Sequence, residues 1–193
     1  MKKIVTLLLC ICMLVTVCLL AASCGSGDEP PEGMQNVAIE TESFKFYVPE
    51  SWLSQANSGV SGARYGNNND KSNVTVTRFV PSYMDEGKPA NYWLTLEKDY
   101  RAQFSTFEMD ESCVSVAEDG TVTTVGKDVT FGGRNAKQYV YTMTFGGTVY
   151  KQMQVLCQHS DGDLYIFTYT SSPACYAAHL EEVAEMLTNF RFG

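Results

Sequence analysis

Three residues near the end of the chain have types and a spacing that could do chemistry: Cys175, His179 and Glu182. Their separations of four and three residues place all three on one face of a helix. A thiol in the first turn of a helix can have a lowered pKa, and a nearby histidine can serve as its base. The same pair can also bind a metal. The pattern therefore raises an envelope enzyme or a metal protein as one alternative.

The competing interpretation is an ordinary helix face. Catalytic sets generally draw on several elements, and no oxyanion donor or fourth metal ligand accompanies these three residues. The sequence contains no P-loop, dinucleotide fingerprint, nucleophile elbow, HExxH or CxxC motif. We therefore expect no enzyme activity, cofactor or metal, and we keep Cys175, His179 and Glu182 as a candidate cluster only.

Two polar loops offer oxygen ligands that calcium could use. One is Asn67 to Asp70, and the other holds His159, Asp161 and Asp163 around a turn. Neither has the full spacing of a calcium-binding loop. Polar turns are the favoured interpretation of both.

The N-terminus has the pattern of an export signal. Lys2 and Lys3 precede an apolar run over residues 4–20, and small residues then lead to Cys24. A retained membrane anchor or a plain secretory cleavage site would be the alternatives. The string LAASC resembles the lipobox of bacterial lipoproteins. That resemblance implies cleavage after residue 23, a thioether-linked diacylglycerol on Cys24, and anchoring at the extracytoplasmic face of the cell membrane.

Residues 24–38 are rich in Gly, Pro and acidic residues, and they predict a flexible acidic tether before a globular domain at 39–193. The formal net charge of the chain is −8. An acidic chain has no basic surface to neutralise phosphates, which argues against nucleic acid as the partner. The same charge should keep the domain away from anionic headgroups, so we expect only the lipid to hold it at the membrane.

Helical and strand periodicities alternate along the domain. Apolar residues spaced by three and four predict an amphipathic helix from Pro89 to Phe104 and another that starts with Ser172 as its N-cap and runs to Phe190. Alternating or β-branched runs predict strands at 43–52, 73–80, 122–131, 135–145, 148–159 and 163–170. Gly146-Gly147 and residues 160–162 predict tight turns, so the last three strands should form an antiparallel meander. LYIFTY is apolar at successive positions, which indicates a strand covered on both faces.

Cysteine pairing stays open at this point. Cys113, Cys157 and Cys175 are an odd number, so at most one disulfide can form among them. Cys157 with Cys175 is the preferred pair, and no disulfide at all is an equal alternative.

Four strings in this chain, FKFYVPESW, FGGRNAKQYVYT, DGDLYIFTYT and the closing LTNFRF, resemble the PsbP-like superfamily. The resemblance covers most of residues 43–192. The superfamily includes an extrinsic photosystem II subunit, DcrB-type bacterial lipoproteins and a Ran-binding nuclear import factor. It implies an α+β fold with a central antiparallel sheet between helices, and accessory or adaptor roles without a common catalytic site. Pro49 and Trp52 match a structural motif of the family.

The leading hypothesis is therefore a lipid-anchored, extracytoplasmic binding or accessory module of a bacterial envelope, with an envelope protein as its partner. A lipoprotein that captures a small ligand is the alternative. The 11 Tyr, 10 Phe and 2 Trp must mostly fill the core, although some on an exposed edge could bind a partner.

Overall fold

The computed structural model describes residues 29–55, 60–79, 89–160 and 162–193. The predicted signal at 1–23, the lipidation site Cys24 and the turn residue Asp161 lie outside these ranges. Within them, no helix is both long and apolar enough to cross a membrane.

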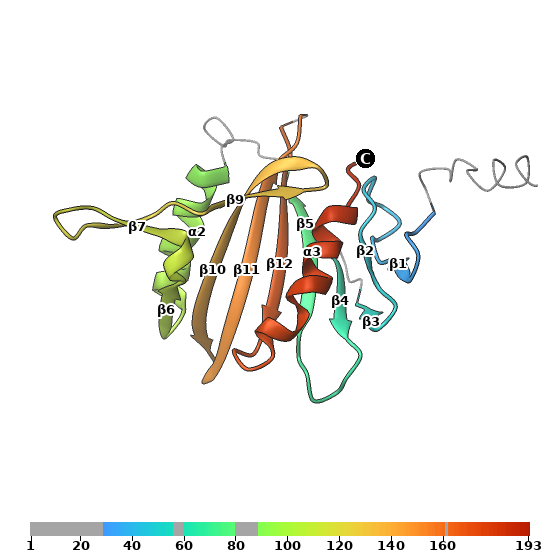
Figure 1. Ribbon diagram of the computed structural model, residues 1–193, viewed down its shortest axis with the longest axis horizontal. Helices are drawn as coiled ribbons and strands as arrows, with labels where there is room; N and C mark the ends of the chain where they lie inside the picture. Colours follow the sequence, from blue (N-terminus) through green and yellow to red (C-terminus); the bar gives the residue numbers. More distant parts are fainter. Residues whose placement is uncertain (1–28, 56–59, 80–88, 161) are drawn as a thin grey trace, which may run out of the picture. The chain divides into compact units, whose positions relative to one another are not determined.

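An antiparallel sheet forms the centre of the domain (Figure 1). The expected meander is confirmed. Phe145 pairs with Thr148 across Gly146-Gly147, and the strand β11 (Thr148–Gln158) pairs with the preceding strand on one side and with the following strand on the other. Both turn glycines have positive φ, as a two-residue hairpin needs. The strand order across the sheet is β3 (Trp52–Ser54), β4 (Ser61–Tyr65), β5 (Asn73–Phe79), β12 (Leu164–Ser171), β11 (Thr148–Gln158), β10 (Arg134–Phe145) and β6 (Thr106–Met109). β9 (Lys127–Phe131) pairs with the first residues of β10, on the same side of β10 as β6.

One face of the sheet is covered by helix α2 (Pro89–Gln103). The Trp93 side chain is fully buried and stacks on Tyr139 of β10, with ring centroids 4.1 Å apart and planes 6° apart. Leu164 and Ile166 of β12 belong to the same apolar cluster. The predicted helix and its apolar stripe are therefore confirmed.

The opposite face is covered by helix α3 (Leu180–Asn189), which lies across the sheet in Figure 1. Val183, Met186 and Leu187 of this helix share a core with Tyr165 and Phe167 of β12. Successive β12 residues thus alternate between two buried layers, as the LYIFTY string predicts. The expected α+β sandwich, with a sheet between helices, is confirmed.

Part of the segment predicted as a tether pairs with the domain. β1 (Met34–Asn36) pairs with β2 (Tyr47–Pro49), and the Val37 side chain is only 2% exposed. These residues lack hydrophobic periodicity, but the ladder with β2 and a buried valine fix them to the domain. Residues 34–37, which precede the boundary expected at residue 39, therefore pair and pack with the domain.

Two predicted strands are interrupted. In 43–52, Phe44 and Phe46 are buried as expected, yet only β2 and the start of β3 are regular strand, and Tyr47 is buried rather than exposed. In 122–131, Gly126 has a φ of +64° and separates β8 (Val122–Thr124) from β9. β8 pairs with β7 (Val114–Val116) in a hairpin that extends away from the main sheet (Figure 1).

The last helix begins later than predicted. Ser172 does cap a turn, because its Oγ accepts from the Cys175 N–H, but residues 176–179 form a 3₁₀ turn, η3 (Tyr176–His179), and α3 starts only at Leu180. The helical face that should align Cys175 with His179 and Glu182 is therefore distorted at its N-terminal end.

Candidate binding site around His179

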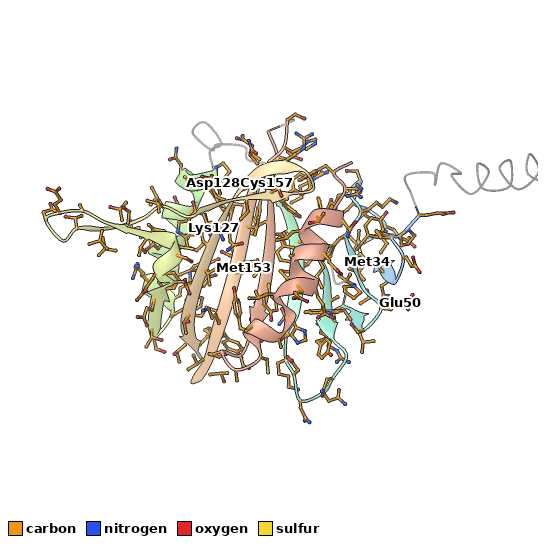
Figure 2. The ribbon with its side chains drawn as sticks, in the orientation of Figure 1. Met34, Glu50, Lys127, Asp128, Met153 and Cys157 are labelled. Atoms are coloured by element: carbon orange, nitrogen blue, oxygen red, sulfur yellow. The ribbon has the colours of Figure 1, made fainter. Side chains whose placement is uncertain are left out.

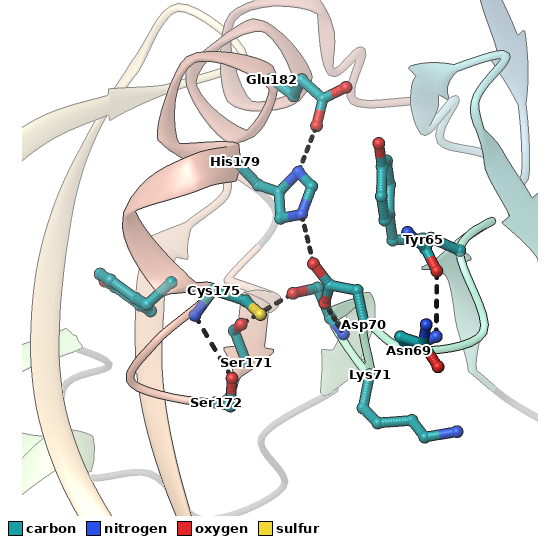
Figure 3. A network of polar contacts seen from close by, with 12 residues as sticks. Tyr65, Asn69, Asp70, Lys71, Ser171, Ser172, Cys175, His179 and Glu182 are labelled. Atoms are coloured by element: carbon teal, nitrogen blue, oxygen red, sulfur yellow. Dashed lines mark hydrogen bonds and ion pairs between the residues drawn. The ribbon is translucent and has the colours of Figure 1, made fainter.

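His179 lies between two carboxylates at the junction of η3 and α3 (Figure 3). Its Nδ1 is 2.7 Å from Oε2 of Glu182, and its Nε2 is 2.9 Å from Oδ2 of Asp70. Both ring nitrogens face acceptors, and only the protonated imidazolium can donate from both. The histidine is 5% exposed, so the charged pairs are sheltered from water.

Two aromatic rings enclose this histidine. The Tyr65 ring of β4 lies 4.2 Å from the imidazole between centroids, and the Trp52 ring of β3 lies 5.4 Å away at a steep angle. Trp52 also donates its indole N–H to Oε2 of Glu182 at 3.1 Å. The Trp52 of the PsbP-like motif is thus a core residue, as expected, and it also orients the carboxylate that holds His179.

Asp70 anchors the loop between β4 and β5 to the C-terminal segment. Its Oδ1 accepts from the Ser72 N–H at 2.8 Å, and the buried Ser72 hydroxyl is 2.7 Å from that of Ser171 at the end of β12. The loop is therefore fixed by contacts with residues about a hundred positions later in the sequence.

The charges of this cluster support one another. Burial is the largest single influence on the His179 pKa and lowers it, but the hydrogen bonds and charges of Asp70 and Glu182 together outweigh burial and raise the pKa above its ordinary value. For Asp70, burial raises the pKa, and the hydrogen bonds from Ser72 and His179 outweigh it and lower the pKa. Both shifts favour an imidazolium beside an ionised carboxylate.

The candidate cluster is brought together only in part. Glu182 binds His179, but the Cys175 thiol forms no hydrogen bond with the histidine, whose two nitrogens are already engaged. The proposed pairing of Cys175 with His179 as nucleophile and base is therefore absent. Sequence reasoning considered Asp70 only as a possible calcium ligand in a polar loop and missed its contact with His179, which follows it by 109 residues.

The preferred disulfide is also wrong, because Cys113, Cys157 and Cys175 are all free. Cys157 pairs with Tyr165 near the start of β12, whereas Cys175 follows the end of that strand. Figure 2 shows Cys157 at the end of the sheet that β9 crosses, and the segment between β12 and α3, to which Cys175 belongs, lies at the opposite end in Figure 1. Burial raises the pKa of the Cys157 thiol to about 11, so it behaves as a small apolar side chain.

The loops considered for calcium contain ordinary polar turns. Asn67 Oδ1 accepts from the Asn69 N–H, and Asp163 forms an ion pair with Arg78 at 3.3 Å. Among the residues that the structure describes, no three His, Cys, Asp or Glu side chains are placed to bind one metal ion.

A polar cavity of about 360 Å³ is lined in part by Asp70. Two of its lining residues are cationic, Arg64 of β4 and Lys71 of the following loop, and the others are amides apart from Asp70 itself. The lining consists of Gln55, Arg64, Asn68, Asp70, Lys71 and Asn73.

The domain has the PsbP-like α+β fold, a mostly antiparallel sheet with helices on its faces. No family model and no curated protein sequence matches the chain. Among solved structures, it is similar to cyanobacterial PsbP (CyanoP) from Synechocystis, with 14% identity, a TM-score of 0.54 and coverage of 89% of this chain and 98% of that one.

Two further structures share the architecture. A protein of unknown function from Pseudomonas aeruginosa has 15% identity and a TM-score of 0.53, covering 80% of this chain and 94% of that one. The Ran-binding protein Mog1p from Saccharomyces cerevisiae has 9% identity and a TM-score of 0.53, covering 82% and 94%. At these identities the likeness concerns the fold.

Proposed function

We propose that this protein is a lipid-anchored, extracytoplasmic binding or accessory module of a bacterial cell envelope, tethered through Cys24. The LAASC string supports the anchor. The fold supports the accessory role, because it is shared with PsbP and with a protein described as Ran-binding. The engagement of both His179 nitrogens supports a non-catalytic role, since neither is available to take a proton from a substrate.

The β7–β8 hairpin is the observation that carries this proposal. Val116 and Val122 are cross-strand partners, and they are 64% and 62% exposed. A short hairpin with apolar side chains outside both core layers is a surface that a partner protein would cover. Glu118 and Asp119 lie in the connecting loop, so the partner surface should be apolar with a basic rim.

A photo-crosslinking amino acid at Val122 of the full chain, expressed in its own cells, tests this role. The matched control places it at Leu94 on α2, which is 56% exposed and is not part of the hairpin. We expect one discrete adduct from position 122 that disappears in a Val116→Ser background. Adducts of equal yield at 94 and 122 would contradict the role of the hairpin. Separately, Cys24→Ala should move the protein from the membrane to the soluble fraction.

Capture of a small ligand is a second candidate function, favoured by the polar cavity beside Asp70. Its lining residues come from three consecutive segments held in place by the His179 cluster, so the cavity is largely preformed.

A further inference from the structure

We propose that the cavity lined by Arg64 and Lys71 binds the phosphate group of an anionic envelope molecule. This inference rests on the ligand-capture function and adds the class of ligand. The β4–β5 loop that forms much of the cavity lies at the opposite end of the sheet from the β7–β8 hairpin (Figure 1), so the two surfaces are separate.

In the part of the chain that the structure describes, the two cations of the cavity face no carboxylate within ion-pair distance. Arg64 donates only to the carbonyl oxygen of Tyr65, at 3.4 Å, and within the described ranges neither Arg64 nor Lys71 forms an ion pair. Figure 3 shows the Lys71 ammonium extending away from His179. Unpaired cations that line one hollow are suited to an anion from outside.

The one carboxylate of the lining is engaged by groups other than the two cations. Asp70 directs one oxygen to the Ser72 N–H and the other to His179, which carries a positive charge in this arrangement. Both oxygens of the acid therefore have partners outside the pair Arg64 and Lys71. Asp70 holds in place the loop that contributes Asn68 and Lys71.

The chemistry of the lining suits a phosphate. Arg64 offers a planar set of N–H donors, Lys71 offers a point charge, and the amides of Gln55 and Asn68 add neutral donors. A phosphate presents three acceptor oxygens and close to two negative charges, so it can use several of these donors at once. The chain as a whole has a charge of −8, so binding of an anion requires a local site of this kind rather than general attraction.

Calorimetric titration of the full chain in neutral detergent tests the proposal with glycerol 3-phosphate as the probe and glycerol as its neutral counterpart. We expect glycerol 3-phosphate to bind and glycerol not to. The double variant Arg64→Gln/Lys71→Gln should weaken binding by about tenfold or more, as loss of charged hydrogen bonds does. The control Lys98→Gln/Arg134→Gln removes the same charge from exposed positions elsewhere and should leave affinity within about twofold.

A second experiment distinguishes a phosphate free in solution from a phosphate in a lipid headgroup. Micelles of neutral detergent that contain phosphatidylglycerol present the phosphate as a singly charged diester in a lipid headgroup, and binding there but not in solution would support the proposal with a lipid source. Binding of glycerol as tightly as glycerol 3-phosphate would contradict the proposal that the ligand is a phosphate. It would not contradict the proposed capture of a small ligand. Binding of neither glycerol 3-phosphate nor phosphatidylglycerol, or equal binding by the double variant with an unchanged circular dichroism spectrum, would overturn the site itself.

Discussion

The Nε2 atom of His179 lies 2.9 Å from Oδ2 of Asp70, although 109 residues separate them in the chain. The contact joins the β4–β5 loop to the start of the C-terminal helix. Because the histidine is also bound to Glu182, a single side chain fixes both the loop and the helix entry.

Stability should fall as pH rises through the neutral range. The His179 pKa is raised in the folded protein, so its stabilising charge is fully present below the unfolded value of 6.5 and is lost as pH rises through the folded pKa. The Asp70 pKa is lowered, so its contribution is lost only in acid and does not oppose this trend. The groups that face His179 are Asp70 and Glu182, with the neutral rings of Trp52 and Tyr65.

Urea unfolding between about pH 6 and pH 9 measures this dependence. The variant His179→Gln should be less stable at the acidic end and should lose the decline that the unchanged chain shows. Parallel curves for the two proteins would contradict the assignment.

Replacing Asp70 with Asn should destabilise the domain, because the amide cannot hold the charge of His179. We expect a loss of about 1–3 kcal/mol in the free energy of unfolding, as for removal of a charged hydrogen bond. Asp99→Asn is the matched control, since Asp99 is exposed on α2 and should change stability by less than about 0.5 kcal/mol. Hydrogen exchange should rise at residues 66–73 in the first variant only.

Gly126 should tolerate alanine poorly. Its φ is +64°, and a Cβ there would lie 2.7 Å from Cε1 of Tyr139, whose ring is held by the stack on Trp93. Gly120 has a similar φ of +82°, but its Cβ would meet nothing within 4 Å. Both alanine variants share the backbone strain, so the contact should cost Gly126→Ala about 1–3 kcal/mol more in thermal or urea unfolding. Equal losses would show that the Tyr139 ring moves aside.

The three cysteines of the domain should differ in reactivity. Cys175 is partly exposed, whereas Cys113 and Cys157 are fully buried and the Cys157 pKa is about 11. Under native conditions, iodoacetamide followed by peptide mass mapping should find Cys175 modified first. Urea should make all three react alike. A peptide linking Cys157 to Cys175 without reductant would contradict the free thiols.

The meander was predictable because its signals are local. Alternation, double-sided burial and a Gly-Gly turn all lie within the residues that form β10, β11 and β12. β4 gave no such signal, because its SGARY sequence lacks β-branched residues. The structure gives the reason at Gly62, where a Cβ would lie 2.8 Å from the carbonyl oxygen of Val74, so the strand needs small residues to pair closely.

The site was predictable only where its residues share a helix. The spacing of His179 and Glu182 indicated their contact, which the structure contains. Asp70 belongs to the polar segment GNNNDKSN, where nothing distinguishes it from a turn residue. Its role depends on the pairing of β5 with β12, which brings Ser72 beside Ser171, and no local pattern encodes that pairing.

The neighbouring positions of β5 and β12 also constrain how the chain folds. The two strands are separated in the sequence by α2 and by strands β6 to β11, so their pairing closes a long loop before its contacts can offset the entropy lost. The meander, joined by short turns, can form early. Val74 and Val76 lack their final neighbours until the chain has been synthesised through β12. The joining of these two halves should therefore limit the folding rate, and the Asp70–His179 contact, which requires it, should be among the last to form.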